Sequence, residues 1–399
     1  MKAVGITAEY NPFHNGHVYH AETARQRSGA GCVIAVMSGD FTQRGDPAIC
    51  GKWERAQAAV NSGAVDLVIE LPFAFACSKA SVFAAGAVDM LAAMGADSIS
   101  FGCEAEKPEL LRALAETLLT DAETIEAARA SLMKNGHSSA KAYELAVAQA
   151  CGEEAAMLLH EPNNILAVEY LKRILTLQKE GSGPMDLPVK RHGSGYAEAS
   201  DETCFAGAGA LRKMIREGSD VSRFIPGRPD FADVKRMEEQ YLQMLKGIVL
   251  RSAPEEIRSI YGVGEGMEHR IIREARKASD LNGLISSLTS RRYTSATVRR
   301  ALTHILAGAG WAEIDLLTAR TPAAGRLLAA GKRGRAYMRE LSDDGFRIIT
   351  NINKEEENLD SGTAELLRLD EKTADLYHLL CGKDIYSASD RVRRPYIEK

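Results

Sequence analysis

Two histidines near the start of the chain, His14 and His17, stand three residues apart and enclose Asn15 and Gly16. Side chains at this spacing lie on the same side of a helical turn, so both imidazoles can reach one ligand. Imidazoles can donate hydrogen bonds to the charge that grows on a phosphate under attack. Gly16 has no side chain, so a nucleotide can approach the backbone closely. This His-x-Gly-His pattern predicts a nucleotide site, although a satisfied surface or core pair of histidines has the same spacing.

The neighbouring sequence places this motif on a strand-to-helix turn. We expect the first strand at residues 2–8 and the first helix from about Gly16, with His20 on the face of that helix. The unpaired N–H groups and the positive dipole end of a helix both favour an anion at such a turn. The predicted ligand of the turn is therefore a phosphate group.

Residues 1–105 alternate between short β-rich runs and longer segments of helical period. The apolar runs are AVGIT, CVIAVM, DLVIELP and SISFG. This alternation predicts a parallel sheet of α/β type, whose ligands bind where the strands end. The strand-end segments are Thr7–His14, Ser38–Arg44, Glu70–Pro72 and Gly102–Glu104. Gln43 and Arg44, with Lys52, are candidates for holding pyrophosphate or an RNA backbone, and a solvated loop explains them equally well.

The rest of the chain reads as mainly helical. Residues 108–180 have helical period, and the short run LPVKRH follows a Gly/Pro/Ser-rich stretch. PGRPDF at 226–231 is the predicted linker, and beyond it we expect helices up to about residue 340, then a short β-like FRIITNI and a last helix. The expected domains are a catalytic one at residues 1–225 and a mainly α-helical one at 226–399.

The composition indicates where the protein is located and which kinds of partner it can have. No apolar run approaches the roughly 20 residues of a membrane helix, so we expect a cytoplasmic protein with no membrane partner. The seven cysteines have no C-x-x-C spacing, which argues against structural zinc or a disulfide framework. A net charge of −4 predicts only local contacts with nucleic acid. Basic clusters occur at Arg291-Arg292 with Arg299-Arg300, at Lys332-Arg333-Arg335, and at Arg391, Arg393 and Arg394.

Longer blocks of sequence carry a family resemblance. They are TAEYNPFHNGHVYH, MSGDFTQRGDPAICGKWERAQAAVNSGAVDLVIELPFAFACSKASVFAAGAVDMLAAMGADSISFGCE and EPNNILAVEYLKRIL, with SSLTSRRYTSATVRRALTHILAG further on. In these blocks the chain closely resembles the bacterial tRNA(Met) cytidine acetate ligases of the HxGH nucleotidyltransferase superfamily. The likeness covers at least residues 1–216 and 286–308. It implies a Rossmann-like HxGH nucleotidyltransferase domain followed by a mainly α-helical C-terminal domain.

The resemblance also implies the reaction. Enzymes of that family activate acetate with ATP as acetyl-adenylate and release pyrophosphate. They then transfer the acetyl group to N4 of the wobble cytidine of elongator tRNA(Met), which forms N4-acetylcytidine. Mg²⁺ is expected with the ATP; Asp40 and Asp46 are candidates to recruit it, but we assign no protein ligand, because this ion usually keeps most of its water and relies on the phosphates. The basic clusters of the C-terminal half are expected to hold the tRNA backbone. No oligomeric state is predicted.

The resemblance further implies which residues form the site. The ATP-binding loop comprises Thr7, Ala8, Glu9, Tyr10, Asn11, Pro12, Phe13, His14, Asn15, Gly16, His17, Val18, Tyr19 and His20, with His14 and His17 catalytic. Gly102 is expected beside the adenosine, where a side chain would collide with ribose or base. Arg191 can fork across two phosphate oxygens, and its alternative role is a surface ion pair. Asn164 completes the pocket with Asn163 as a neighbour that can exchange roles, although an asparagine before a helix is often only a cap.

One short segment departs from the family pattern. The family typically carries Ser-Ala-Thr followed shortly by Ile-Arg, whereas this chain has Gly207 and Gly209 at the hydroxyl positions and retains Arg212. Each missing hydrogen bond to phosphate costs about 1.5 to 3 kcal/mol if nothing replaces it. Backbone N–H groups of a glycine-rich helix start are a possible replacement. We therefore expect ATP to bind more weakly or with a rearranged γ-phosphate end.

Two other functions fit parts of the sequence. A small-molecule adenylyltransferase would use the same His-x-Gly-His chemistry and explains residues 1–105, but not the long helical half with its basic clusters. A non-catalytic RNA-binding protein with a decayed nucleotide site would explain Gly207 and Gly209.

Overall fold

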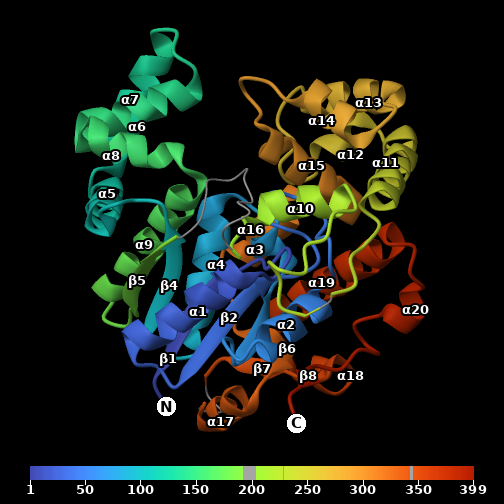
Figure 1. Cartoon of the computed structure of the whole chain (residues 1–399). Coiled ribbons are helices and arrows are strands. Elements are labelled where there is room, and N and C mark those ends of the chain that lie inside the picture. The colour runs from blue at the N-terminus through green and yellow to red at the C-terminus, as the bar shows by residue number, and fades with distance from the viewer. Residues whose placement is uncertain (192–203, 228, 342–344) are drawn as a thin grey trace.

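The computed structural model describes residues 1–191, 204–227, 229–341 and 345–399. A sheet with helices on both faces forms its centre (Figure 1). Its strands are β1 (Ala3–Ala8), β2 (Cys32–Ser38), β3 (Leu67–Leu71), β4 (Ser98–Cys103), β5 (Met185–Lys190), β6 (Ala324–Ala330), β7 (Arg347–Ile349) and β8 (Tyr396–Ile397). The four strands expected within residues 1–105 are thus confirmed as β1 to β4.

The strand order β5-β4-β1-β2-β3-β6-β7 defines where a ligand can bind. Strands β1 to β5 are parallel, and β1 lies between β2 and β4. The chain therefore reverses its direction of travel across the sheet at β1, and the carboxyl ends of β1 and β4 form the topological switch point. Open α/β sheets bind ligands in the crevice at this point.

Apolar residues on both faces of the strands explain the two helical layers. Val4 and Ile6 of β1 pack in one apolar cluster with residues of α1 (Asn15–Ser28) and α2 (Lys52–Asn61). Ala3 belongs to the cluster on the other face, which includes residues of α4 (Ala80–Ala93) and α9 (Pro162–Lys179). A strand buried on both faces needs apolar residues at successive positions, which is the pattern of a covered parallel sheet.

Two groups of helices lie beyond the carboxyl ends of the parallel strands, one on each side of the sheet (Figure 1). The insertion lobe, residues 108–160, follows β4 and contains α5 (Pro108–Thr120), α6 (Ala122–Lys134), α7 (Ser139–Cys151), α8 (Glu153–Met157) and the short η1 (Leu158–His160). The C-terminal lobe, residues 234–307, contains α11 (Val234–Arg251), α12 (Pro254–Arg258), α13 (Met267–Lys277), α14 (Leu281–Leu288) and α15 (Ser295–Ala307). The other helices are α3 (Phe73–Ala76), α10 (Ala208–Arg216), α16 (Trp311–Thr318), α17 (Lys332–Glu340), α18 (Ile352–Glu355), η2 (Glu356–Asn358), α19 (Ser361–Leu380) and α20 (Ile385–Ala388).

The expectation of helices up to residue 340 is wrong at β6. AGRLLAA forms a fully buried strand that pairs antiparallel with β3, and β7 and β8 pair along its other side. Alanine and leucine favour helix in isolation, but strand formation depends more on the neighbours that a segment packs against. The sheet consequently takes strands from both sides of residue 225, where we predicted a domain boundary.

Candidate active site

The His-x-Gly-His motif lies on the turn between β1 and α1, as the sequence predicted. Helix α1 begins at Asn15, and His14 is its N-cap residue with an extended backbone. The Nδ1 atom of His14 accepts a hydrogen bond of 3.0 Å from the N–H of Gly16, and the Nδ1 atom of His17 accepts one of 3.2 Å from the N–H of His14. The two rings stack with centroids 3.7 Å apart. The pair therefore occupies the helix end nearest the switch point.

These backbone contacts determine where each neutral imidazole carries its hydrogen. A backbone N–H can only donate, so both Nδ1 atoms must present a lone pair, and the hydrogen must lie on Nε2. His14 is 4% exposed, and its Nε2 has no hydrogen-bond partner among the described residues. A buried donor without an acceptor costs about 1 to 3 kcal/mol. The arrangement thus offers a fixed N–H donor that an anionic oxygen would satisfy.

The environment keeps these histidines neutral. Burial, followed by the charges of Arg191 and Arg212, lowers the pKa of His14 to about 3. Burial also lowers the pKa of His17 well below its usual value, with smaller effects of His14 and Arg191. Burial and Arg191 lower the pKa of His20 to about 4. At neutral pH the histidines are therefore uncharged donors, and the positive charge of the site comes from the two arginines.

The lowered pKa values predict a pH-dependent stability. Below pH 6.5 these histidines bind protons in the unfolded chain but not in the folded chain. The free energy of unfolding that is present above pH 6.5 therefore decreases as pH falls. For His14 the loss continues to about pH 3 and approaches about 1.4 kcal/mol per pH unit. Urea unfolding at pH 7, 6 and 5 measures it. His14→Asn, which keeps a capping side chain, should show a shallower slope than wild type by that amount; equal slopes would contradict the assignment.

Arg191 joins the ends of β4 and β5 at the same edge. A Cβ added to Gly102 would lie 3.2 Å from Cγ of Arg191, so the glycine lets this side chain lie against β4. The Nη1 of Arg191 donates to Oδ1 of Asn163 at 3.5 Å, and Nδ2 of Asn163 donates to Oε1 of Glu104 at 2.6 Å. Asn164 is buried, and its Oδ1 accepts from the N–H of Glu104 at 2.9 Å. Neither asparagine caps α9, so the capping alternative is not observed.

The residues before His14 are held by their own contacts. Oε1 of Glu9 accepts from the N–H of Gln43 at 2.7 Å. Oδ1 of Asn11 accepts from the N–H of Ile49 at 2.9 Å, and its carbonyl accepts from Nη1 of Arg212 at 2.8 Å. Tyr10 has a φ of 49°. The remaining predicted residues up to here, Thr7, Ala8, Pro12 and Phe13, lie in β1 or on the buried turn that follows it.

The predicted residues after His14 make space for its ring or form contacts with neighbouring segments. A Cβ added to Gly16 would lie 2.8 Å from Cε1 of His14, so the glycine makes room for that ring. Asn15 donates through Nδ2 to the carbonyls of Cys204 and Arg223, both at 3.0 Å. His20 contacts Oγ of Ser100 in β4 at 2.9 Å. Val18 packs against the apolar cluster of α1, and Tyr19 contacts the ring of Phe205.

Arg55 is a positioning residue that our sequence reasoning did not identify. Its guanidinium is 1% exposed and donates to the carbonyls of Glu9 at 2.5 Å and Gly39 at 2.5 Å. It also donates to the carbonyls of Ser38 at 3.2 Å and Cys50 at 2.8 Å. One side chain therefore ties the loops after β1 and β2 together. The available signal was its spacing in α2, because a cation three residues after Lys52 falls on the apolar face that covers the sheet.

The candidate role of Lys52 in holding pyrophosphate or RNA is wrong. Its Nζ is buried between Oε1 of Glu70 at 2.7 Å and Oδ2 of Asp390 at 2.6 Å. Arg326 of β6 pairs with the same Oδ2 at 2.6 Å. Burial alone would raise the pKa of Asp390, but Lys52 and Arg326 together lower it. This ionic network, comprising Lys52, Glu70, Arg326 and Asp390, joins the C-terminal segment to the sheet.

The predicted metal candidates are also engaged in protein contacts. Asp40 accepts from the N–H of Lys52 at 2.8 Å, and Asp46 pairs with Arg299. Within the described ranges no group of three or more His, Cys, Asp or Glu side chains could hold a metal ion, and the seven cysteines are free. None of the described helices combines the length and apolar character needed to cross a membrane.

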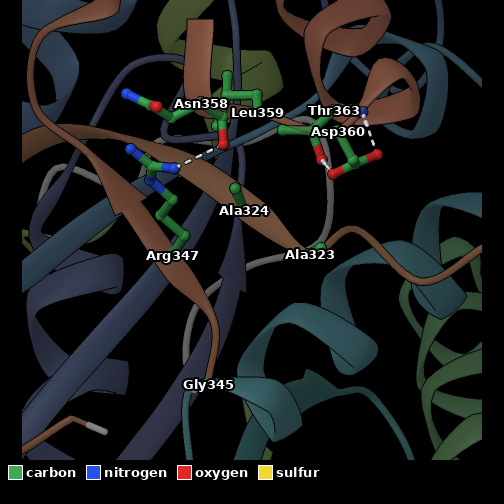
Figure 2. Close-up of a pocket in the computed structure, with 8 residues that line it drawn as sticks. All are labelled: Ala323, Ala324, Gly345, Arg347, Asn358, Leu359, Asp360 and Thr363. Atoms are coloured by element: carbon green, nitrogen blue, oxygen red, sulfur yellow. Dashed lines mark hydrogen bonds between the residues drawn. The ribbon is translucent and has the colours of Figure 1, made fainter. Parts of the chain in front are cut away.

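A separate cavity lies away from the histidines. It has a volume of about 240 Å³ and lies between β7 and the start of α19. Figure 2 shows the residues that line it. Nη1 of Arg347 donates to the carbonyl of Asn358 at 3.0 Å, and Asp360 caps α19 through the N–H of Thr363 at 3.1 Å. Its polar groups thus bond to one another, and none of the predicted site residues lines it.

Known proteins share this architecture and sequence over nearly the whole chain. Residues 1–391 match the HIGH Nucleotidyl Transferase family model. The chain is 36% identical to the tRNA(Met) cytidine acetate ligase of Syntrophotalea carbinolica over 85% of this chain and 82% of that protein. It is 36% identical to that of Bacillus subtilis, over 85% and 84% of the two chains.

Solved structures agree with the sequence comparison. The crystal structure of apo TmcAL from Thermotoga maritima superposes with a TM-score of 0.88 at 28% identity, over 100% of this chain and 99% of that one. The same protein bound with alpha-thio ATP superposes with a TM-score of 0.85, at the same identity and coverage. The nucleotidyltransferase fold is therefore confirmed. The chain belongs to the tRNA(Met) cytidine acetate ligase family of HIGH nucleotidyltransferases.

Proposed function

We propose that this chain is an ATP-dependent ligase that activates acetate as acetyl-adenylate and acetylates N4 of the wobble cytidine of elongator tRNA(Met). The observation that carries the proposal is the pair of neutral imidazoles at the start of α1, whose Nε2–H donors stand at the switch point of the sheet. Named relatives with this activity cover most of the chain, and the Thermotoga maritima structure holds an ATP analogue in the same fold.

In the first step the protein aligns two anions. A carboxylate oxygen of acetate attacks the α-phosphorus of ATP, a new P–O bond forms, and the bond to the bridging oxygen breaks as pyrophosphate leaves. The Nε2–H groups of His14 and His17 donate to the α-phosphate oxygens, where negative charge concentrates. Arg191 and Arg212 supply permanent positive charge near the same ring, which their effect on the pKa of His14 reflects. Gly102, Asn163 and Asn164 form the adenosine side.

In the second step the acetyl group moves to RNA. The uncharged N4 amine of cytidine attacks the carbonyl carbon of acetyl-adenylate, AMP leaves, and the amine loses a proton. A wobble base lies in a loop and unstacks at low cost, which suits a site that reads its exposed edge. No cysteine or serine nucleophile is required.

Mg²⁺ is expected to enter with the nucleotide. The carboxylates that the sequence suggested, Asp40 and Asp46, do not fit as ligands, because each is already bonded within the protein. The ion would then be held by the ATP phosphates and water, as is common for this metal.

The glycine substitutions are testable at the start of α10. Gly207 is the N-cap residue of α10 without a side-chain cap, and no atom of the described residues lies within 4 Å of a Cβ added to it. Gly207→Ser/Gly209→Thr restores both hydroxyls of the family pattern, and the serine has room at position 207. If the hydroxyls bind phosphate, calorimetric titration should give an ATP affinity tighter than wild type by about tenfold or more. Equal affinities would dismiss this argument and leave backbone N–H groups as the phosphate donors.

The decisive experiment is acetate-dependent exchange of pyrophosphate into ATP. The proposal requires exchange with acetate and, in cells, N4-acetylcytidine in tRNA(Met) only when the protein is present. Exchange that needs a different co-substrate would indicate a small-molecule adenylyltransferase instead. Absence of exchange with RNA binding intact would indicate a non-catalytic RNA-binding protein.

A further inference from the structure

The two helical lobes differ in charge, although they flank the same edge of the sheet. The insertion lobe, residues 108–160, carries eight Asp and Glu against four Lys and Arg. The C-terminal lobe, residues 234–307, carries 13 Lys and Arg against eight Asp and Glu. A polyanion is repelled by the first lobe and attracted by the second, since binding of nucleic acid depends on basic residues that replace counterions.

Contacts of α15 connect the C-terminal lobe to the nucleotide turn. Thr303 donates to the carbonyl of Gly45 at 2.5 Å, and Nη1 of Arg300 donates to the carbonyl of Gln43 at 3.3 Å. The N–H of Gln43 donates in turn to Glu9, directly after β1. Gln43 therefore links α15 to the loop of the paired histidines through its carbonyl and its N–H group.

Helix α15 extends from these contacts to an exposed turn. The turn before its N-cap residue Thr294 comprises residues 291–293, seven to nine residues from Arg300, which is roughly 11 to 14 Å at the rise of a helix. It carries Arg291 and Arg292, both exposed, and neither forms an ion pair with any described residue. By contrast, Arg299 of the same predicted basic cluster is already paired with Asp46.

Hydrogen bonds within this turn and to a neighbouring loop stabilise its conformation. The N–H of Ser290 donates to the carbonyl of Tyr293 at 2.9 Å, and Oγ of Ser290 accepts from the N–H of Tyr293 at 3.2 Å. The hydroxyl of Tyr293 reaches the carbonyl of Glu265 at 3.5 Å, and Gly264 leaves room for it. The guanidinium of Arg292 lies 5.3 Å from the centroid of the Tyr293 ring. The half-buried ring of Tyr293 and the exposed guanidinium of Arg292 thus lie together at this turn.

We propose that the α14–α15 turn, Arg291, Arg292 and Tyr293, is the surface that holds the anticodon arm of the tRNA. Arg291 and Arg292 contact the phosphates that flank the wobble cytidine, and Tyr293 stacks on an unpaired loop base. Unstacked bases on tyrosine and arginine planes, with basic residues on the backbone, are the usual means of reading single-stranded RNA loops. This proposal rests on the proposed function, which supplies the substrate.

The test uses the full chain with two variants, Arg291→Ala/Arg292→Ala and Tyr293→Ala. Binding of an unmodified elongator tRNA(Met) transcript is measured over a series of salt concentrations, and binding of its isolated anticodon stem-loop alongside. The arginine variant should bind both RNAs more weakly, with a slope of log affinity against log salt shallower by about 0.7 to 0.9 for each lost phosphate contact. Tyr293→Ala should weaken both by about tenfold.

A matched control removes two cations from the opposite edge of the sheet. Arg339 is exposed on α17, which follows β6 at the end where it meets the start of β3 (Figure 1), and Lys2 is exposed directly before β1. Lys2→Ala/Arg339→Ala should leave RNA affinity and its salt slope unchanged. An equal loss in this control would mean that only net charge matters, which overturns the proposal.

The remaining outcomes separate this surface from the proposed function. Both turn variants should retain wild-type exchange of pyrophosphate with acetate, because the adenylation step involves no RNA. If the wild type lacks that exchange, the proposed function fails. If the wild type has exchange and binds tRNA while the turn variants bind it equally well, the surface is wrong. Weaker binding of the whole tRNA with unchanged binding of the stem-loop also overturns it.

Discussion

His14→Ala should lower the rate of acetate-dependent pyrophosphate exchange by about 10² to 10³, or about 2.7 to 4 kcal/mol of transition-state stabilisation. The neutral Nε2–H of His14 has no hydrogen-bond partner in the described part of the chain, so it can donate to the charge that develops on the α-phosphate. His17→Ala should have a comparable effect, because its Nδ1 is anchored in the same way. Affinity for tRNA should change little.

Loss of the helix cap is a separate effect that a second variant isolates. His14→Asn retains a side chain that can accept from the N–H of Gly16, and asparagine is among the best N-cap residues. It should keep the stability of wild type more closely than His14→Ala and still lose exchange. His269→Ala, at an exposed histidine of α13, is the matched control and should exchange at the wild-type rate. Exchange that survives in both His14 variants and in His17→Ala would refute the proposed role.

Lys52→Met should lower the free energy of unfolding by about 3 to 5 kcal/mol, as measured by urea denaturation. The substitution removes the cation that lies between Glu70 and Asp390, and it leaves two buried carboxylates with too little positive charge. Because Lys52 is enclosed by protein, the KM for ATP of the folded enzyme should stay close to that of wild type.

Two comparisons test this explanation. Lys79→Met removes an exposed lysine at the start of α4 and should change the unfolding free energy by no more than about 0.5 kcal/mol. Lys52→Met/Asp390→Asn should cost less than the sum of the two single variants, because each single variant disrupts the same ion pair. If Lys52→Met instead has wild-type stability and a strongly raised KM for ATP, Lys52 would belong to the nucleotide site.

Local sequence determined the turn at which we propose that phosphate binds. The apolar run of β1 and the helical period of α1 specify a strand followed by a helix, so the turn with His14 and His17 had to lie between them. Backbone N–H groups at that turn depend only on the helix itself. Quoted blocks of sequence also identified the family, and the comparisons confirm it.

Only the tertiary structure decided contacts between distant segments. AGRLLAA has the composition of a helix and becomes β6 because β3 offers an open edge on one side and β7 and β8 cover the other. Lys52 and Arg55 lie three residues apart in α2, yet they have different partners. Lys52 pairs with the carboxylates of Glu70 and Asp390. Arg55 donates hydrogen bonds to four carbonyl groups at the strand ends and the loops that follow them. The protonation state of the histidines likewise depends on burial and on Arg191 and Arg212, which lie far along the chain. The spacing of apolar residues indicates which face of a helix or strand is buried. The partner of a charged group on that face depends on which other elements pack against it.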